Sequence, residues 1–472
     1  MGQVQPGWGQ LLGGKNGVRS ITLVGGVALH AINVYIVVTI LPSLVKDIGG
    51  ERYYSWAATL FVTASLIGAA LVSKLLAKIG PRTAYILAAL IFAIGTLGCG
   101  FSPTMPIFLG FRIIQGFGGG ILLSLTYSMV RIVFERPLWP LAMGLISGVW
   151  GVSTLLGPAI GGIFAQYESW RWAFWLVSIL AFLFTFLAYA VLPQRSQNHS
   201  ANPIPILQLL LLTGLVLVIS AGSAMESNFA KFAGLILGLA AFFILAIIDQ
   251  RAKYRLLPEG AFSPSSQLFA IYILMLALSI AVNGAELYLP LFLQVLHGLS
   301  PLPAGYIAAL MSIGWTAGTL PSATVRARRL PVLIKSTPFL CIIGMLALCW
   351  LVPTMQTSTG YLILVSFALF IVGVGAGSIW PHLLTRVLQS AKENDADLAS
   401  ASLTSVQLFS TALSAAISGT IVNFAGLTNP GGIVGTITAA QALFVVLIIL
   451  MLLGMPYAWR ISRSIKNDNT TN

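Results

Sequence analysis

Apolar stretches of roughly twenty residues recur fourteen times along this chain, separated by short polar segments. An apolar stretch of about 20 residues is long enough to span the hydrocarbon core of a bilayer as an α-helix. We therefore expect an all-α polytopic membrane protein with 14 transmembrane helices. The predicted spans are 20–45, 54–73, 83–101, 104–130, 138–164, 171–193, 204–223, 230–249, 266–296, 303–324, 336–353, 360–385, 399–424 and 433–459.

Lysine and arginine residues are concentrated in every second polar segment. Of the 25 basic residues, 20 fall on the side of the predicted membrane that holds the N-terminus. The other side holds only Lys46, Arg52, Arg171 and Lys231, and Arg112 lies within a span. Because basic loops stay in the cytoplasm, this asymmetry predicts that both termini are cytoplasmic. Topology thus accounts for the net charge of +13 without a nucleic-acid partner, and attraction to anionic membrane lipids is a by-product.

The composition excludes several other classes of protein. Charged residues make up 8% of the chain and hydrophobic residues 57%, and the mean hydropathy is +0.92. No polar interval exceeds about thirty residues, which is too short for a separate soluble domain. The sequence contains no H-E-x-x-H, G-x-S-x-G or Walker motif, so we expect neither an enzyme nor a metal or cofactor site. Cys99, Cys341 and Cys349 lie within spans and are interpreted as packing residues.

Similar features recur in the two halves of the chain. Basic segments follow the second and tenth spans, at 73–82 and 325–335, and the fifth and thirteenth spans are rich in small residues. Paired halves in a helical membrane protein point to alternating access around a central site. We expect a cytoplasmic N-terminal tail, a six-helix bundle, a linker with two extra helices, a second six-helix bundle and a cytoplasmic tail, at 1–19, 20–193, 194–265, 266–459 and 460–472. Glu226 and Lys231, between the extra helices, are interpreted as surface charges.

Five short motifs carry a resemblance to a known family. They are Arg112-Ile-Ile-Gln-Gly-Phe-Gly-Gly-Gly120, Gly157-Pro-Ala-Ile-Gly-Gly162, Ser169-Trp-Arg-Trp-Ala-Phe174, and the segments 289–305 and 373–381. In this order they resemble the major facilitator superfamily, specifically its fourteen-helix drug:proton antiporter branch. The resemblance covers residues 20–459 and implies the major facilitator fold, with two six-helix bundles and two extra central helices.

The resemblance assigns roles to two further groups of residues. Gly157, Pro158, Gly161 and Gly162 match the antiporter motif, in which a tight helix contact favours export; ordinary small-residue packing is the alternative. Gly80 and Arg82 survive from the pattern of the loop between the second and third helices. The acidic position of that loop is Ala77, so this chain lacks the carboxylate of the usual charge contact between the two halves.

Three of the ionisable residues inside the predicted spans are candidates for function. Glu286 is the only one of the twelve acidic residues placed well within a span, where burial favours the neutral carboxylic acid and suits it to carry a proton. Arg112 is costly in hydrocarbon, so we expect it to face an aqueous cavity or a partner. An ion pair with Glu286 and hydrogen bonds to backbone carbonyls are the alternatives. His30 is a second candidate for proton coupling, although a lone His within the membrane more often joins two helices.

These residues lead to a functional hypothesis. We expect a monomeric, proton-coupled exporter of small amphiphilic molecules, of the multidrug-efflux type, in a bacterial cytoplasmic (inner) membrane. Asn33 stands where drug exporters of the branch usually carry Asp, which favours a neutral or anionic cargo such as a siderophore as the alternative. A non-transporting sensor or receptor on the same fold is also open. The predicted substrate cavity contains Asn33, Tyr35, Gln115, Asn283 and Gln294.

Overall fold

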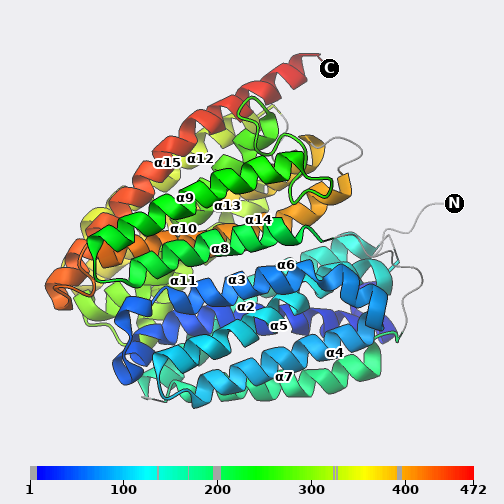
Figure 1. Cartoon of the computed structure of the whole chain (residues 1–472), viewed down its shortest axis with the longest axis horizontal. Helices are drawn as coiled ribbons and strands as arrows, with labels where there is room; N and C mark the ends of the chain where they lie inside the picture. Colours follow the sequence, from blue (N-terminus) through cyan, green and yellow to red (C-terminus); the bar gives the residue numbers. More distant parts are fainter. Residues whose placement is uncertain are drawn as a thin grey trace. The chain divides into compact units, whose positions relative to one another are not determined.

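The computed structural model describes residues 8–135, 138–167, 169–194, 204–322, 325, 328–390 and 396–471. Helices and the connections between them make up these ranges, and the segment 252–266 is a long non-helical connection (Figure 1). The chain divides into two compact units. Unit 1 comprises Met1–Gly49 and Leu60–Ile204, and unit 2 comprises Gly50–Thr59 and Pro205–Asn472.

Unit 1 contains most of the first half of the helices. They are α1 (Trp8–Leu12), α2 (Gly14–Ile48), α3 (Trp56–Ala70, from Leu60 onward), α4 (Val72–Phe101), α5 (Met105–Val133), α6 (Trp139–Gln166) and α7 (Arg171–Val191). Within this unit α4 packs along both α5 and α7, as Figure 1 shows, and α2 packs along α6.

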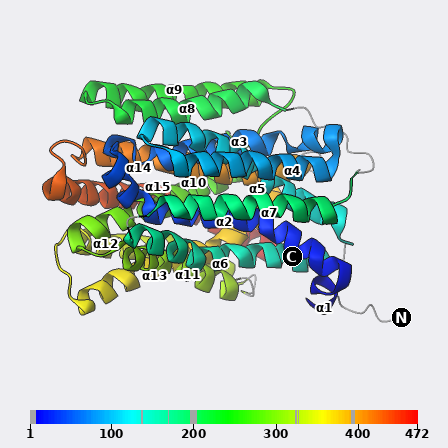
Figure 2. The same cartoon turned by 90° about the horizontal axis from the view of Figure 1, so that it is seen from below.

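Unit 2 contains the remaining helices. They are η1 (Glu51–Tyr53), α8 (Ile206–Ala224), α9 (Asn228–Arg251), α10 (Gln267–His297), α11 (Pro301–Ser322), α12 (Leu330–Leu351), α13 (Thr359–Ser390), α14 (Ala396–Phe424) and α15 (Gly432–Thr471). The helices α8 and α9 lie side by side (Figure 2), and α8 packs against α14.

Twelve of the described helices are long and apolar enough to cross a membrane. The two other helices of at least 15 residues are α3, with 15, and α11, with 22. Length and hydropathy therefore support a multi-pass membrane protein with about 12 spanning helices, and the count of fourteen stays a prediction.

The prediction of a loop at 73–82 is wrong, because most of this segment is helical. Helical backbone begins at Val72 and is interrupted only at Gly80, where φ is 75° and ψ is 169°. A positive φ is readily adopted by glycine, and the following Pro81 has no N–H that a helix would have to satisfy. One residue thus makes the turn. Lys74 and Lys78 lie on the exposed face of a helical turn, which resembles a polar loop when only composition is considered.

Helical structure also extends into both predicted tails. Within the predicted tail at 1–19, α1 ends at Leu12 and α2 already begins at Gly14. At the other end, α15 continues to Thr471. Polar residues in these segments lower the hydropathy without breaking the helix, so the apolar pattern marks the membrane and not the helix ends.

A glycine contact joins α3 to α5 in unit 1. A Cβ atom added to Gly116 would overlap the backbone of Phe61, and one added to Gly120 would overlap the backbone of Ser65. Small residues that let two backbones approach are a main source of helix association in membranes, where lipid is as apolar as a side chain. The glycines of the 112–120 motif thus have a structural role.

The same contact occurs between α11 and α13 in unit 2. A Cβ atom on Gly373 would overlap Met311, and one on Gly377 would overlap Trp315. These glycines lie 257 residues after their counterparts in α5, from 116 to 373 and from 120 to 377. The two units therefore repeat one packing arrangement at the same sequence spacing.

Candidate functional site

Arg112 lies in a buried polar cluster within unit 1. Its side chain is 1% exposed, and its guanidinium group donates a hydrogen bond from Nη1 to Oε1 of Gln115, one turn further along α5. The guanidinium carbon lies 4.1 Å from the centre of the Phe61 ring. A ring face attracts a cation electrostatically, so Phe61 and Gln115 together replace part of the hydration that Arg112 loses.

Gln115 connects this arginine to two other helices. Its Nε2 donates to Oδ1 of Asn33 on α2 at 2.9 Å and to Oγ1 of Thr96 on α4 at 2.8 Å. Gln115, Asn33 and Thr96 are all buried. A side-chain amide offers two donors and one acceptor oxygen, and here it uses both kinds of group. The result is a continuous polar network across α2, α4 and α5.

His30 lies next to this network and packs against two aromatic rings. Its ring centroid is 5.2 Å from that of Phe61 and 6.1 Å from that of Trp150. A Cβ atom on Gly119 would come within 3.0 Å of its Nδ1, so the glycine leaves space for the ring. The structure thus brings together Arg112, Gln115, Asn33 and His30, four of the predicted site residues.

Glu286 occupies the middle of α10 in unit 2. Ser312 of α11 donates a hydrogen bond from Oγ to Oε1 of Glu286 at 2.9 Å. The carboxylate side chain is partly exposed, although it lies within a helix whose other positions are mostly buried. The carboxyl group of Glu286 thus has a hydrogen-bonding partner, and the residue as a whole is partly exposed in unit 2. Its role as a proton carrier stays a prediction, and an ion pair with Arg112 stays the alternative.

The other predicted cavity residues differ in their surroundings. Asn283 lies one turn before Glu286 and donates from Nδ2 to the backbone oxygen of Ser279 at 2.8 Å and to its hydroxyl at 2.9 Å. Gln294 is partly exposed, and its buried Nε2 has no hydrogen-bond partner among the described residues. Tyr35 is partly exposed on α2. Their roles toward a substrate stay predictions.

The predicted antiporter motif packs against α2. A Cβ atom on Gly157 would overlap Tyr35, and one on Gly161 would lie 3.0 Å from the backbone oxygen of Ile36. Pro158 and Gly162 are also buried, and α6 continues through the proline. The motif therefore makes a close backbone contact between two helices of unit 1, as expected of small residues in a membrane.

The motif that begins at Ser169 joins the ends of two helices. Trp170 donates from Nε1 to Oδ2 of Asp47 at 3.1 Å, and Arg171 donates from Nη1 to the same oxygen at 2.5 Å. Trp170 is buried against Phe108 and Phe174. The motif thus fixes the start of α7 to the end of α2.

Arg82 has a structural role at the other end of α7. Its Nε donates to the backbone oxygen of Leu192 at 2.8 Å, and its backbone N–H donates to that of Pro193 at 3.2 Å. Its guanidinium lies 5.2 Å from the ring centre of Tyr189. A cation at a helix C-terminus is favourable because the last carbonyl groups lack helical partners. Arg82, next to Gly80 and Pro81, thus anchors the turn.

The sequence did not reveal a hydrogen-bonded junction in unit 2. Asn423 of α14 donates from Nδ2 to the backbone oxygens of Arg52 at 3.1 Å and Ser223 at 3.2 Å. Its own backbone oxygen accepts a hydrogen bond from Nζ of Lys231 at 3.0 Å. Lys231 is buried, so its interpretation as a surface charge is wrong. The sequence did contain one sign of this junction, which is a polar residue at or near the end of each of four helices: Arg52, Ser223, Lys231 and Asn423.

Among the described residues, no group of three or more His, Cys, Asp or Glu side chains could hold a metal ion. Of the ionisable groups inside the spanning helices, Arg112 and His30 flank the same Phe61 ring in unit 1, and Glu286 lies in unit 2. Proton exchange and electrostatic recognition of a ligand are the chemistry that such groups can perform.

Comparison with known proteins assigns the family. Residues 23–415 match the family model described as the Major Facilitator Superfamily. A probable multidrug-efflux transporter of Mycobacterium tuberculosis is 34% identical over 458 residues, which cover 95% of each chain. The multidrug efflux pump SdrM of Staphylococcus aureus is 28% identical over 306 residues, which cover 64% of this chain and 67% of that protein.

Solved structures share the fold at low sequence identity. A bacterial homologue of the human lysosomal transporter Spinster matches with a TM-score of 0.69 and 13% identity, covering 96% of this chain and 98% of that one. A peptide transporter of the POT type in complex with alafosfalin matches with a TM-score of 0.68 and 16% identity, covering 97% of each chain. These similarities concern the fold alone.

Proposed function

Because the chain belongs to the major facilitator superfamily, we propose that it is a proton-coupled secondary exporter of small amphiphilic molecules. The observation that carries this proposal is the 34% identity, over 95% of both chains, to a probable multidrug-efflux transporter. The chain is a multi-pass membrane transporter and not an enzyme. We further propose the fourteen-helix arrangement, with α3 and α11 as additional spans and two turns of helix before Gly80 completing the second one.

Glu286 is the proposed proton carrier. A carrier must be held within the membrane and must also exchange its proton with water. The hydrogen bond from Ser312 holds one carboxyl oxygen, and the partial exposure of the residue supports the proposal that water can reach it. Export follows if protonation of Glu286 and binding of the cargo favour different conformations of the transporter.

Arg112 and its network supply the proposed cargo-binding chemistry of unit 1. The arginine is a fixed positive charge, and Gln115 couples its position to α2 and α4. A ligand that displaces one of these hydrogen bonds would change the packing of three helices at once. We propose His30 as an additional member because it shares the Phe61 ring with Arg112.

The test is transport driven by an imposed pH gradient. Purified protein is reconstituted into proteoliposomes, and efflux of cationic, neutral and anionic fluorescent amphiphiles is recorded with and without the gradient. We expect Glu286→Gln to abolish the response to the gradient while binding of the same probes remains measurable. The matched control is Glu259→Gln, which removes an acidic side chain outside the spanning helices of the same unit.

Normal proton-dependent transport by Glu286→Gln would remove this residue from the mechanism. Transport by the wild type that ignores the pH gradient would instead contradict proton coupling as a whole. Binding of the probes without any transport would favour a sensor or receptor.

A second candidate is export of an endogenous neutral or anionic metabolite, such as a siderophore. Asn33 favours it, because an amide accepts the hydrogen bond from Gln115 without adding a negative charge beside Arg112. The cluster therefore keeps an electropositive character that suits an anionic ligand better than an organic cation. The anionic probe of the same transport experiment separates the two candidates.

A further inference from the structure

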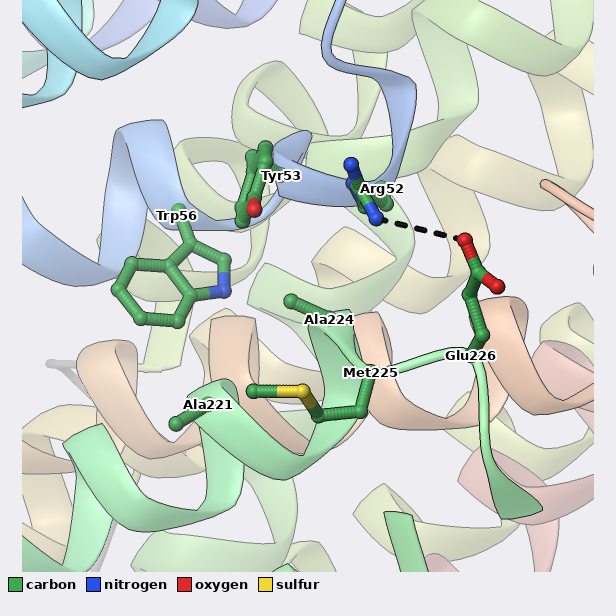
Figure 3. A pocket seen from close by; sticks show the side chains of 7 residues that line it. All are labelled: Arg52, Tyr53, Trp56, Ala221, Ala224, Met225 and Glu226. Carbon is green, nitrogen blue, oxygen red and sulfur yellow. Dashed lines mark ion pairs between the residues drawn. The ribbon is translucent and has the colours of Figure 1, made fainter. Parts of the chain in front are cut away.

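A pocket of about 450 Å³ lies in unit 2 (Figure 3). It lies between η1, the start of α3, and the last turn of α8. Its lining residues are Arg52, Tyr53, Trp56, Ala221, Ala224, Met225 and Glu226. The volume is in the range of sites that take a small organic ligand.

One wall of the pocket is aromatic and held in place. Trp56 donates from Nε1 to the backbone oxygen of Ser220 at 3.1 Å, which fixes the indole ring against α8. Tyr53 lies edge-to-face with it, with the ring centres 5.9 Å apart. Ala221, Ala224 and Met225 form the apolar floor. A rigid indole face above an apolar floor is suited to a ligand with an ammonium group next to an apolar body.

The rim of the pocket carries one charge of each sign. Nη1 of Arg52 lies 3.7 Å from Oε1 of Glu226, and the two side chains are 49% and 92% exposed. A pair this exposed contributes little to stability, so a ligand can exchange with it at low cost. Arg52 disfavours a purely cationic ligand and Glu226 a purely anionic one. The rim is therefore complementary to a ligand that itself carries both charges.

The surroundings place the pocket at the level of a membrane interface. It is built from the two connections that follow α2 and α8, both spanning helices. Phe229 and Phe232, on the first turns of the adjoining α9, are exposed, as is Phe424 at the end of α14. Exposed aromatic residues near helix ends are typical of the headgroup region.

We propose that this pocket binds the headgroup of a zwitterionic phospholipid. The phosphate lies against Arg52, and the ammonium lies against Glu226 and the face of Trp56. The first carbons of the acyl chains rest on the floor formed by Ala221, Ala224 and Met225. Asn423 and Lys231 hold the pocket's framework, because they tie η1, α8 and α9 to the end of α14.

Native mass spectrometry of the full chain in detergent tests the proposal. Phosphatidylethanolamine, phosphatidylcholine and phosphatidylglycerol with identical acyl chains are added in turn, and bound lipid is counted. We expect the two zwitterionic lipids to be retained at least threefold better than phosphatidylglycerol. Arg52→Gln and Trp56→Leu should each reduce this retention at least threefold, and Glu226→Gln should remove the preference over phosphatidylglycerol.

The chain offers a matched control pair for these substitutions. Arg255 and Glu259 are also 3.7 Å apart and partly exposed, but they lie outside the pocket. Arg255→Gln and Glu259→Gln should leave the retention unchanged. A melting temperature for every variant checks that it is folded, and Trp56→Phe, which keeps an aromatic ring, provides a milder change.

Three outcomes of the retention experiment would overturn the proposal. They are equal retention of all three lipids by the wild type, unchanged retention in folded Arg52→Gln and Glu226→Gln variants, and an equal loss in the control variants. Free glycerophosphoethanolamine, which has the same phosphodiester headgroup without acyl chains, is added as a competitor. If it displaces the lipid at equimolar concentration, the ligand is a free zwitterion and not a membrane lipid.

Discussion

The side-chain amide of Gln115 donates a hydrogen bond to the side-chain oxygen of Asn33 across 2.9 Å, joining α5 to α2 inside unit 1. Both residues are buried, and the acceptor oxygen of Gln115 is occupied by Arg112. The charge state at position 33 is therefore transmitted to the arginine through a single side chain.

Asn33→Asp should move the cargo preference toward cations. The new carboxylate can still accept from Gln115, and it partly neutralises the field of Arg112. We expect the efflux rate of a cationic probe, relative to a neutral one, to rise by about threefold to tenfold, which corresponds to about 0.7–1.4 kcal/mol. Efflux assays with both probes measure this ratio, and Asn33→Ala is the uncharged control. An equal shift in the control would assign the effect to packing.

Arg112→Lys should lose most of the transport activity although it keeps the positive charge. An ammonium group cannot lie flat on the Phe61 ring and make a guanidinium-type contact with Gln115 at the same time. We expect at least a tenfold lower transport rate. Arg112→Ala should abolish transport and also destabilise the protein by about 1–3 kcal/mol, because the buried oxygen of Gln115 loses a donor. Wild-type rates in Arg112→Lys would show that charge alone suffices.

Gly157→Ala should destabilise unit 1, because the added methyl group overlaps Tyr35 on α2. Overpacking of this kind costs about 1–3 kcal/mol. The matched control is Gly148→Ala on the same helix, where nothing lies within 4 Å of the new atom. Alanine is the better helix former by about 0.8–1 kcal/mol, so the control should be neutral or stabilising. Thermal melting of both variants in one detergent gives the comparison, and a stable Gly157→Ala protein would refute the close contact.

Asp47→Asn should weaken the junction between α2 and α7 only slightly. The carboxylate accepts from both Trp170 and Arg171, but Arg171 and Asp47 are 33% and 46% exposed. Solvent screens such a pair, and a double-mutant cycle with Arg171→Gln should give a coupling energy of less than about 1 kcal/mol. A larger coupling energy would mean that the junction is shielded from water in the membrane-embedded protein.

The positions of most helices could be predicted from the sequence, because spanning segments are set by the thickness of the bilayer. The helix ends could not. The segment at 73–82 contains polar residues and a glycine, yet only Gly80 departs from helical backbone. Polar composition indicates that a segment is exposed to water. It does not distinguish an exposed helical turn from a loop.

The candidate site could be predicted in part. The motif around Arg112 and Gln115 pointed to a functional region, and the two residues share one polar network with Asn33. The junction of Asn423 and Lys231 could not be predicted, because its partners are backbone oxygens on helices far apart in the sequence. The polar residues at these helix ends indicate that hydrogen bonds form there, but backbone acceptors leave no pattern that would show which helix ends meet.

The glycine contacts that recur at a spacing of 257 residues also show where the two halves have diverged. The same spacing carries Arg112 and Gln115 onto Leu369 and Val372, both completely buried and both apolar. The helices α5 and α13 thus share the surfaces on which they meet their neighbours, while at these two pairs of positions only α5 carries an ionic and an amide group. Exchanging these helix segments between the two halves should therefore preserve the glycine contacts and move the arginine and glutamine to the other half.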